Sequence, residues 1–197
     1  MKLPKSYYLN TDVSLLAADL LGKILFTLKE DYLTAGIIVE TEAYFGIEDK
    51  ASHAYGGRRT TRTEIMYKEG GVAYVYLCYG IHYLLNVVTS VKDDPKCVLI
   101  RSIEPFEGLE IMELRRNMPI TNKAISSGPG SVCKSLGIDS TFNKTSLTEE
   151  HIWIEDRGIS YQPSQIGTAP RIGIAYAQEH ADLPLRFFVK DSKYSRK

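Results

Sequence analysis

The sequence predicts an α+β fold: a single domain, residues 1–197, built mainly on a curved antiparallel β-sheet that carries a protruding β-hairpin and is surrounded by helices. Three observations predict this class. Strand-like apolar runs follow one another through short turns, which favours antiparallel pairing. Helical periodicity is confined to short, scattered segments. The chain shows no repeat and no linker-like segment, and 197 residues suit one well-cored domain.

The first elements are a short helix, two strands and a long loop. Thr11 or Asp12 can cap a helix that ends at Gly22, because such side chains accept hydrogen bonds from helix N–H groups and glycine suits a helix end. Strand-like runs follow at residues 24–28 and 35–44, and the second alternates in polarity. Residues 45–71 are polar and rich in glycine and arginine, and a loop of that length is usually functional.

The later elements begin with a hairpin. Two strong strand patterns, residues 72–78 and 83–90, flank the turn sequence Tyr79-Gly80-Ile81-His82. A turn at 93–95 leads to a strand at 97–103. Helical spacing predicts a helix over 105–118 and another that starts at residues 128–130 and ends at Gly137. Residues 152–155, 171–174 and 185–189 are further predicted strands.

Composition and charge bound the class of protein. Net charge is zero, yet residues 50–68 and 184–197 each hold five basic residues against one acid. Such segregation fits either one basic face for an anionic partner or two solvated charge runs. No apolar run approaches a membrane span, no signal peptide is recognised, and the three cysteines are widely spaced and resemble buried free thiols. We therefore expect a cytoplasmic protein without a zinc site.

Glu42 is the first candidate for chemistry. It lies on the apolar strand at 35–44 and shares a face with Glu40 and Tyr44. Burial makes a carboxylate a better proton acceptor, which suits a general base. The alternative is that Glu40 and Glu42 form the wet face of an edge strand. Tyr44 and the polar loop containing His53 favour a site.

The hairpin is rich in tyrosine, with Tyr74, Tyr76, Tyr79 and Tyr83 within ten residues. Cross-strand packing explains some of them, but a tyrosine before a glycine at a hairpin tip is expected to be exposed. An exposed aromatic on a rigid protrusion can enter a base stack, and aromatics in a cleft can hold an unstacked base. Binding DNA also needs cations, for which the loop residues Arg58, Arg59 and Arg62 are candidates.

Three further residues stay open to two interpretations each. Asn86 is polar in an apolar strand and is either a structural bridge or a reader of a base edge. Arg101 lies in an apolar strand and needs a carboxylate partner, for which Glu42 is the obvious candidate. The Gly128 turn before a helix either binds a phosphate or only starts the helix.

The sequence resembles the 3-methyladenine (alkyladenine) DNA glycosylase family. The resemblance rests on seven short motifs that occur in one order over nearly the whole chain. They are IVETEAY at 38–44, DKASH at 49–53, GGRRT at 56–60, YVYLCYG at 74–80 followed by Asn86, VLIR at 98–101, SGPG at 127–130 and APRIG at 169–173. Ser131 and Val132 depart from the family pattern, in which a lysine commonly follows the SGPG turn.

The resemblance implies a monofunctional enzyme of base excision repair that flips alkylated or deaminated purines, of the 3-methyladenine, hypoxanthine and ethenoadenine type, from duplex DNA. It implies no cofactor, no metal, no membrane, no obligate protein partner and a monomer. Glu42 would activate the attacking water and Arg101 would place it. Tyr44, His53 and Tyr76 would stack around the base. Other implied roles are Asn86 as a gatekeeper against guanine and Tyr79 as the wedge in the duplex, helped by Ile81 and His82.

Two other functions compete with the glycosylase. A carbohydrate glycoside hydrolase could use Glu40 and Glu42 as its pair of acids, although the basic loop would then lack a purpose. A non-catalytic nucleic-acid-binding module could use the tyrosines as a stacking platform, which leaves Glu42 without a role.

Overall fold

The fold was analysed in a computed structural model that describes residues 1–196. The main sheet has the strand order β3-β4-β5-β2-β1-β6, and these neighbouring strands pair antiparallel. The strands are β1 (Ile24–Lys29), β2 (Tyr32–Tyr44), β3 (Val72–Cys78), β4 (His82–Thr89), β5 (Lys96–Glu107) and β6 (Ile152–Glu155). The predicted α+β class with its antiparallel sheet is confirmed.

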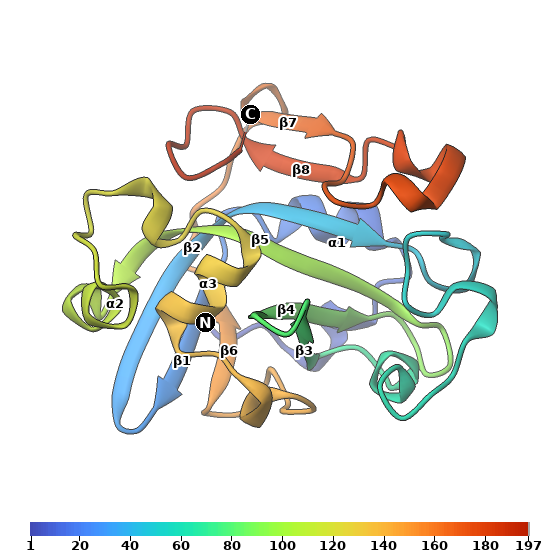
Figure 1. The fold of residues 1–197 in the computed structure, drawn as a ribbon, viewed down its shortest axis with the longest axis horizontal. Helices are drawn as coiled ribbons and strands as arrows, with labels where there is room; N and C mark the ends of the chain where they lie inside the picture. The colour runs from blue at the N-terminus through green and yellow to red at the C-terminus, as the bar shows by residue number, and fades with distance from the viewer. Residues whose placement is uncertain (197) are drawn as a thin grey trace.

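Strand β2 is the backbone of the site. Its first half pairs with β1, and its last residues pair with β8 (Arg186–Val189) on the same edge, while β5 runs along the other edge. Register shifts in the β2–β5 pairing occur around Glu40 and bend both strands. In Figure 1 the two long strands cross the molecule together, with β8 and β7 (Ile166–Ala169) lying along one side. The end of β2 is therefore covered on both edges.

Three helices surround the sheet: α1 (Val13–Asp19), α2 (Leu109–Arg116) and α3 (Pro129–Leu136). Asp12 caps α1 by accepting hydrogen bonds from the N–H groups of Ser14 and Leu15, as its sequence predicts. The large core cluster contains apolar residues of α1, α3 and the sheet. A second cluster, which includes Met66, Tyr74 and Cys97, lies beneath the long loop and supports one side of the site.

Two predicted elements are wrong. Residues 171–174 form no strand; the chain bends there, with Gly173 at φ +79°. The predicted helix over 105–118 starts only at Leu109, because β5 continues to Glu107 and Gly108 breaks the chain with φ +69°. The short strand β7 has no equivalent in the sequence prediction; a four-residue strand that contains Gly167 carries too weak a pattern.

Candidate active site

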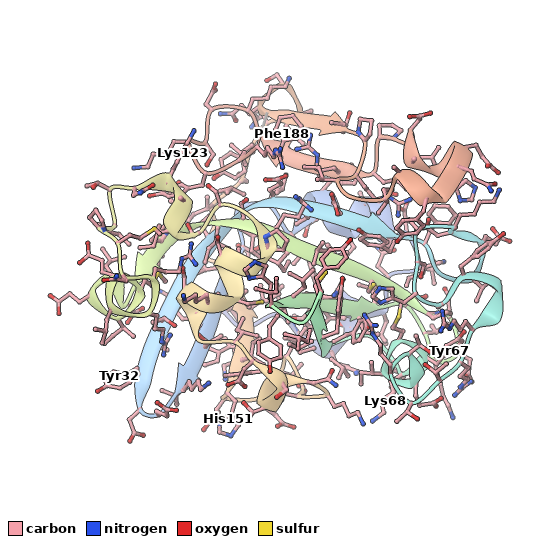
Figure 2. All side chains as sticks on the ribbon, in the orientation of Figure 1. Tyr32, Tyr67, Lys68, Lys123, His151 and Phe188 are labelled. Carbon is pink, nitrogen blue, oxygen red and sulfur yellow. The ribbon has the colours of Figure 1, made fainter. Side chains whose placement is uncertain are left out.

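A cavity of about 460 Å³ lies where the 45–71 segment, the β3–β4 hairpin and residues 172–176 meet. Figure 2 places Tyr67 of that segment at the opposite end of the molecule from Tyr32 at the start of β2. Of the residues that the sequence singled out, the cavity lining contains Tyr44, His53, Arg62, Tyr76, Tyr79, Asn86 and Arg101. The fold thus gathers side chains from five separate segments around one space of small-molecule size.

Glu42 lies behind residues of the cavity lining and is fully buried, at 0% exposure. Its Oε1 accepts the N–H of Ile172 at 2.7 Å and lies 3.1 Å from Nη1 of Arg101, and its Oε2 accepts the Tyr44 hydroxyl at 2.9 Å. All three partners line the cavity, although Glu42 itself does not. A carboxylate offers about four acceptor positions. One therefore remains unused, on Oε2.

Arg101 connects the two carboxylates of β2. Its Nε donates to Oε1 of Glu40 at 3.1 Å, while Nη1 faces Glu42. The predicted pairing of Arg101 with Glu42 is confirmed. Glu40 is 1% exposed and accepts three more hydrogen bonds, from Ser102, Arg186 and the backbone N–H of Arg196. The interpretation of Glu40 and Glu42 as the wet face of an edge strand is wrong, since both are buried in paired strand.

Aromatic rings form the walls of the cavity. The rings of His53 and Tyr76 meet edge to face at 4.8 Å, and Tyr74 and Tyr76 lie 5.3 Å apart. At the end of β2, Tyr44 is fixed through its hydroxyl to Glu42. Burial, with a further contribution from Glu42, raises the pKa of Tyr44 well above its usual range, so the hydroxyl stays a donor to the carboxylate.

His53 is neutral at pH 7. Burial, followed by the charges of Arg62 and Arg58, lowers the pKa of its imidazole to about 4. Its Nδ1 lies 2.8 Å from the Tyr74 hydroxyl, which also accepts from Nε of Arg62 at 3.3 Å. Burial raises the pKa of Tyr74 to about 12, so this hydroxyl keeps its hydrogen. When the hydroxyl donates this hydrogen to His53 Nδ1, the neutral imidazole carries its single N–H hydrogen on Nε2.

Asn86 lies on β4, the strand between β3 and β5. It is 4% exposed. Its side chain donates a hydrogen bond to the Tyr74 carbonyl at 3.4 Å and accepts one from the Cys97 thiol at 3.8 Å. It also lines the cavity. The two interpretations of Asn86 are therefore compatible, because the side chain bridges β3 and β5 and still contacts the space that a ligand would fill.

The hairpin tip is exposed and strained. Tyr79 is 90% exposed with φ +50°, Gly80 has φ +70°, and the turn closes through the Ile81 N–H on the Cys78 carbonyl at 3.0 Å. A bulky residue at positive φ is costly and points to a functional constraint. Ile81 is 72% exposed, and His82 is also exposed, although it lies so close to α3 that a Cβ added to Gly130 would be 2.9 Å from it.

The three loop arginines occupy different environments. Arg58 is exposed, without an ion-pair partner among residues 1–196. Arg59 bonds Glu64 and Asp93 and lies over the Tyr67 ring. Arg62 reaches the cavity instead. The sequence predicted the same role for all three, because their spacing does not indicate which way each side chain points.

Arg171 is a site residue that the sequence analysis missed. Its guanidinium forms a fully buried pair with Asp49, donates to the Ala43 carbonyl at 3.0 Å and lies 4.7 Å from the centre of the Tyr44 ring. It therefore fixes Tyr44 and the neighbouring Ile172, which are two of the three partners of Glu42. Its sequence signals are a charge between an alanine-proline pair and an apolar run, and its place in the APRIG motif at 169–173.

Other features of the described residues carry less chemistry. The Gly128 N–H donates to Ser102, and Ser131 accepts from Arg116 at the start of α3. Among residues 1–196, no three His, Cys, Asp or Glu side chains are arranged to hold a metal ion. No helix in the described part of the chain has the length and apolarity to cross a membrane.

Comparison with known proteins identifies the family. Residues 7–193 match the family described as Methylpurine-DNA glycosylase. A protein of Chlamydia abortus is 50% identical over 188 residues, covering 95% of this chain and 97% of its own. A protein of Desulfitobacterium hafniense is 42% identical over 200 residues, with 98% and 97% covered, and one of Clostridium perfringens is 43% identical over 205 residues, with both chains fully covered.

These three relatives carry the name "Putative 3-methyladenine DNA glycosylase". The match extends over nearly all of the chain and includes every segment that contributes to the cavity. The chain therefore belongs to the methylpurine-DNA glycosylase family and is a DNA glycosylase of DNA repair.

Proposed function

We propose that the chain is a monofunctional, monomeric N-glycosylase that flips alkylated or deaminated purines out of duplex DNA and hydrolyses the bond between base and sugar with a water activated by Glu42. The observation that carries the proposal is the setting of Glu42. The carboxylate is held by three donors beneath an aromatic cavity, and one acceptor position on Oε2 stays unused. The names of the relatives support 3-methyladenine as one substrate.

In this mechanism the cavity receives the flipped base. Tyr44, Tyr76 and His53 offer flat apolar surfaces against which a purine can stack. Base flipping costs a few kcal/mol of lost stacking, least for a damaged base. Tyr79, at the exposed hairpin tip, fills the space that the base leaves in the duplex.

The chemical step needs one water. The oxygen of the water attacks C1′ of the sugar while Glu42 accepts a proton from that water. The electron pair of the C1′–N bond leaves with the base. Arg101 keeps Glu42 in place and balances the negative charge of its carboxylate. Asn86 lies at the lining, where its side chain would clash with the 2-amino group of guanine.

The carbohydrate hydrolase is less well supported. It needs a second acid, and Glu40 already accepts hydrogen bonds from four donors. Such a carboxylate has no free position from which to protonate a leaving group.

The test is base release from defined duplexes that carry one 3-methyladenine, hypoxanthine or ethenoadenine. We expect abasic sites that break only after alkali treatment, because water and not an amine attacks the sugar. Borohydride should trap no covalent adduct between protein and DNA. A trapped adduct would overturn the monofunctional mechanism, and release of sugars from oligosaccharides with none from DNA would overturn the glycosylase.

A further inference from the structure

Arg62 lies at the cavity lining, a position that a residue binding only DNA phosphate would not need to occupy. It reaches from the exposed loop to the cavity lining, where its Nε lies 3.3 Å from the Tyr74 hydroxyl. Its guanidinium lies 4.7 Å from the centre of the Tyr76 ring, which is within the range of a cation–π contact. Two contacts with the aromatic wall therefore hold the cation beside the space for the base.

The positive charge of Arg62 is not balanced. The charged residues of the cavity lining are Arg62 and Arg101, and no carboxylate is among them. Arg101 is neutralised by Glu40 and Glu42. Arg62 has no carboxylate within salt-bridge distance among residues 1–196, and only its Nε is bonded, which leaves the N–H groups of Nη1 and Nη2 without a protein acceptor.

His53 responds to the same charge. After burial, the charge of Arg62 is the largest cause that lowers the pKa of this imidazole. A protonated ring in the cavity is thus opposed by Arg62, and a cationic purine would meet the same repulsion. A neutral purine with acceptor atoms on its edge meets only attraction.

We propose that Arg62 is a catalytic residue for neutral purine lesions, such as hypoxanthine, and supplies the positive charge that a cationic alkylpurine already carries. This inference rests on the proposed glycosylase function. As the C1′–N9 bond breaks, its electron pair moves onto the neutral base, and negative charge builds on O6 and N7. Arg62 donates hydrogen bonds to these atoms and keeps all its protons; the departing base takes a proton from solvent after release.

Cationic lesions behave differently. A purine alkylated at N3 or N7 is positively charged in the nucleoside and becomes neutral on leaving, so no negative charge needs to be stabilised. For such a base Arg62 stabilises the transition state little, and its positive charge repels the cationic base in the ground state. Removing Arg62 therefore changes the ratio of rates for the two classes, whereas the loss of a phosphate contact weakens all duplexes equally.

The experiment compares hypoxanthine with 3-methyladenine, a cationic lesion without a 2-amino group, in the same duplex, with saturating enzyme and single turnover. For Arg62→Met we expect release of hypoxanthine to fall about 10- to 100-fold, the range for one charge-assisted hydrogen bond. Release of 3-methyladenine should stay within about threefold of wild type or rise, because its transition state needs no such donor. Arg62→Lys keeps the charge without the planar fork and should lose less on hypoxanthine.

Arg157→Met is the matched control, since Arg157 also lies over an aromatic ring but far from the cavity, beside Glu155. It should leave the ratio unchanged. An equal fall on both lesions in Arg62→Met and Arg62→Lys, or no fall on hypoxanthine, overturns the proposal. If wild-type protein releases neither base, the proposed function itself fails, which is a distinguishable result.

Discussion

Replacing Arg171 by methionine should destabilise the protein strongly, because its partner Asp49 would remain as a buried charge. Both side chains are 0% exposed, and two hydrogen bonds join them. Removing one member of a buried pair costs about 3–5 kcal/mol, since the other charge loses its compensation. In a protein of 150–250 residues each kcal/mol lowers Tm by about 2–4 °C, which gives a fall of about 6–20 °C.

The assay is thermal unfolding of Arg171→Met, Asp49→Leu and the double variant at fixed pH. Each single variant should show the full loss, and the double variant should lose less than the sum, because no isolated charge stays buried. High salt should change the result little, as the pair is shielded from solvent. Single losses below about 1 kcal/mol, or strict additivity, would refute the view that the pair is a unit.

Three further predictions concern protonation, the wedge and the loop. The pKa of His53 is about 4 when folded and 6.5 when unfolded, so the unfolded state binds more protons between these values; stability should fall by roughly 3 kcal/mol from pH 6.5 to 4, and His53→Gln should flatten that slope in pH-dependent unfolding. Tyr79→Gly should relieve a positive φ and stabilise the fold by about 1 kcal/mol, yet weaken discrimination of lesion duplexes in titrations. Arg58→Met should reduce the salt slope of DNA binding by about 1, and Arg59→Met by less, because Arg59 is already paired with Glu64 and Asp93; equal slopes would contradict this.

Local signals predicted those parts of the fold that depend on neighbouring residues. Asp12 before an apolar helix, and tyrosine with glycine between two strand patterns, were sufficient for the cap of α1 and the β3–β4 hairpin. The pairing of Arg101 with Glu42 was also predictable, because an arginine in an apolar strand requires a carboxylate.

The remaining features depend on contacts between distant residues. Arg171 and Asp49 are 122 positions apart, and no local pattern joins them. A second long-range contact explains why residues 171–174 are not a strand: the Ile172 N–H bonds the Glu42 side chain instead of a neighbouring strand. An apolar run alone does not distinguish these two uses of a backbone N–H.

The direction of Arg62 was not predictable for a related reason. Three arginines within five residues indicate a cationic loop, but the aromatic partners that decide each side chain's place lie on other segments. Arg62 lies over the Tyr76 ring at the cavity. Arg59 instead lies over the Tyr67 ring and pairs with two carboxylates outside the cavity.

The central claim is that Glu42 activates the water, and Glu42→Gln tests it most directly. Glutamine keeps the size and the hydrogen bonds of one oxygen but accepts no proton. Single-turnover base release should fall by at least about 100-fold, the lower range for loss of a general base, while binding to the lesion duplex is retained. Glu48→Gln, at an exposed position nearby, should release base at the wild-type rate. Near wild-type release by Glu42→Gln would contradict the claim.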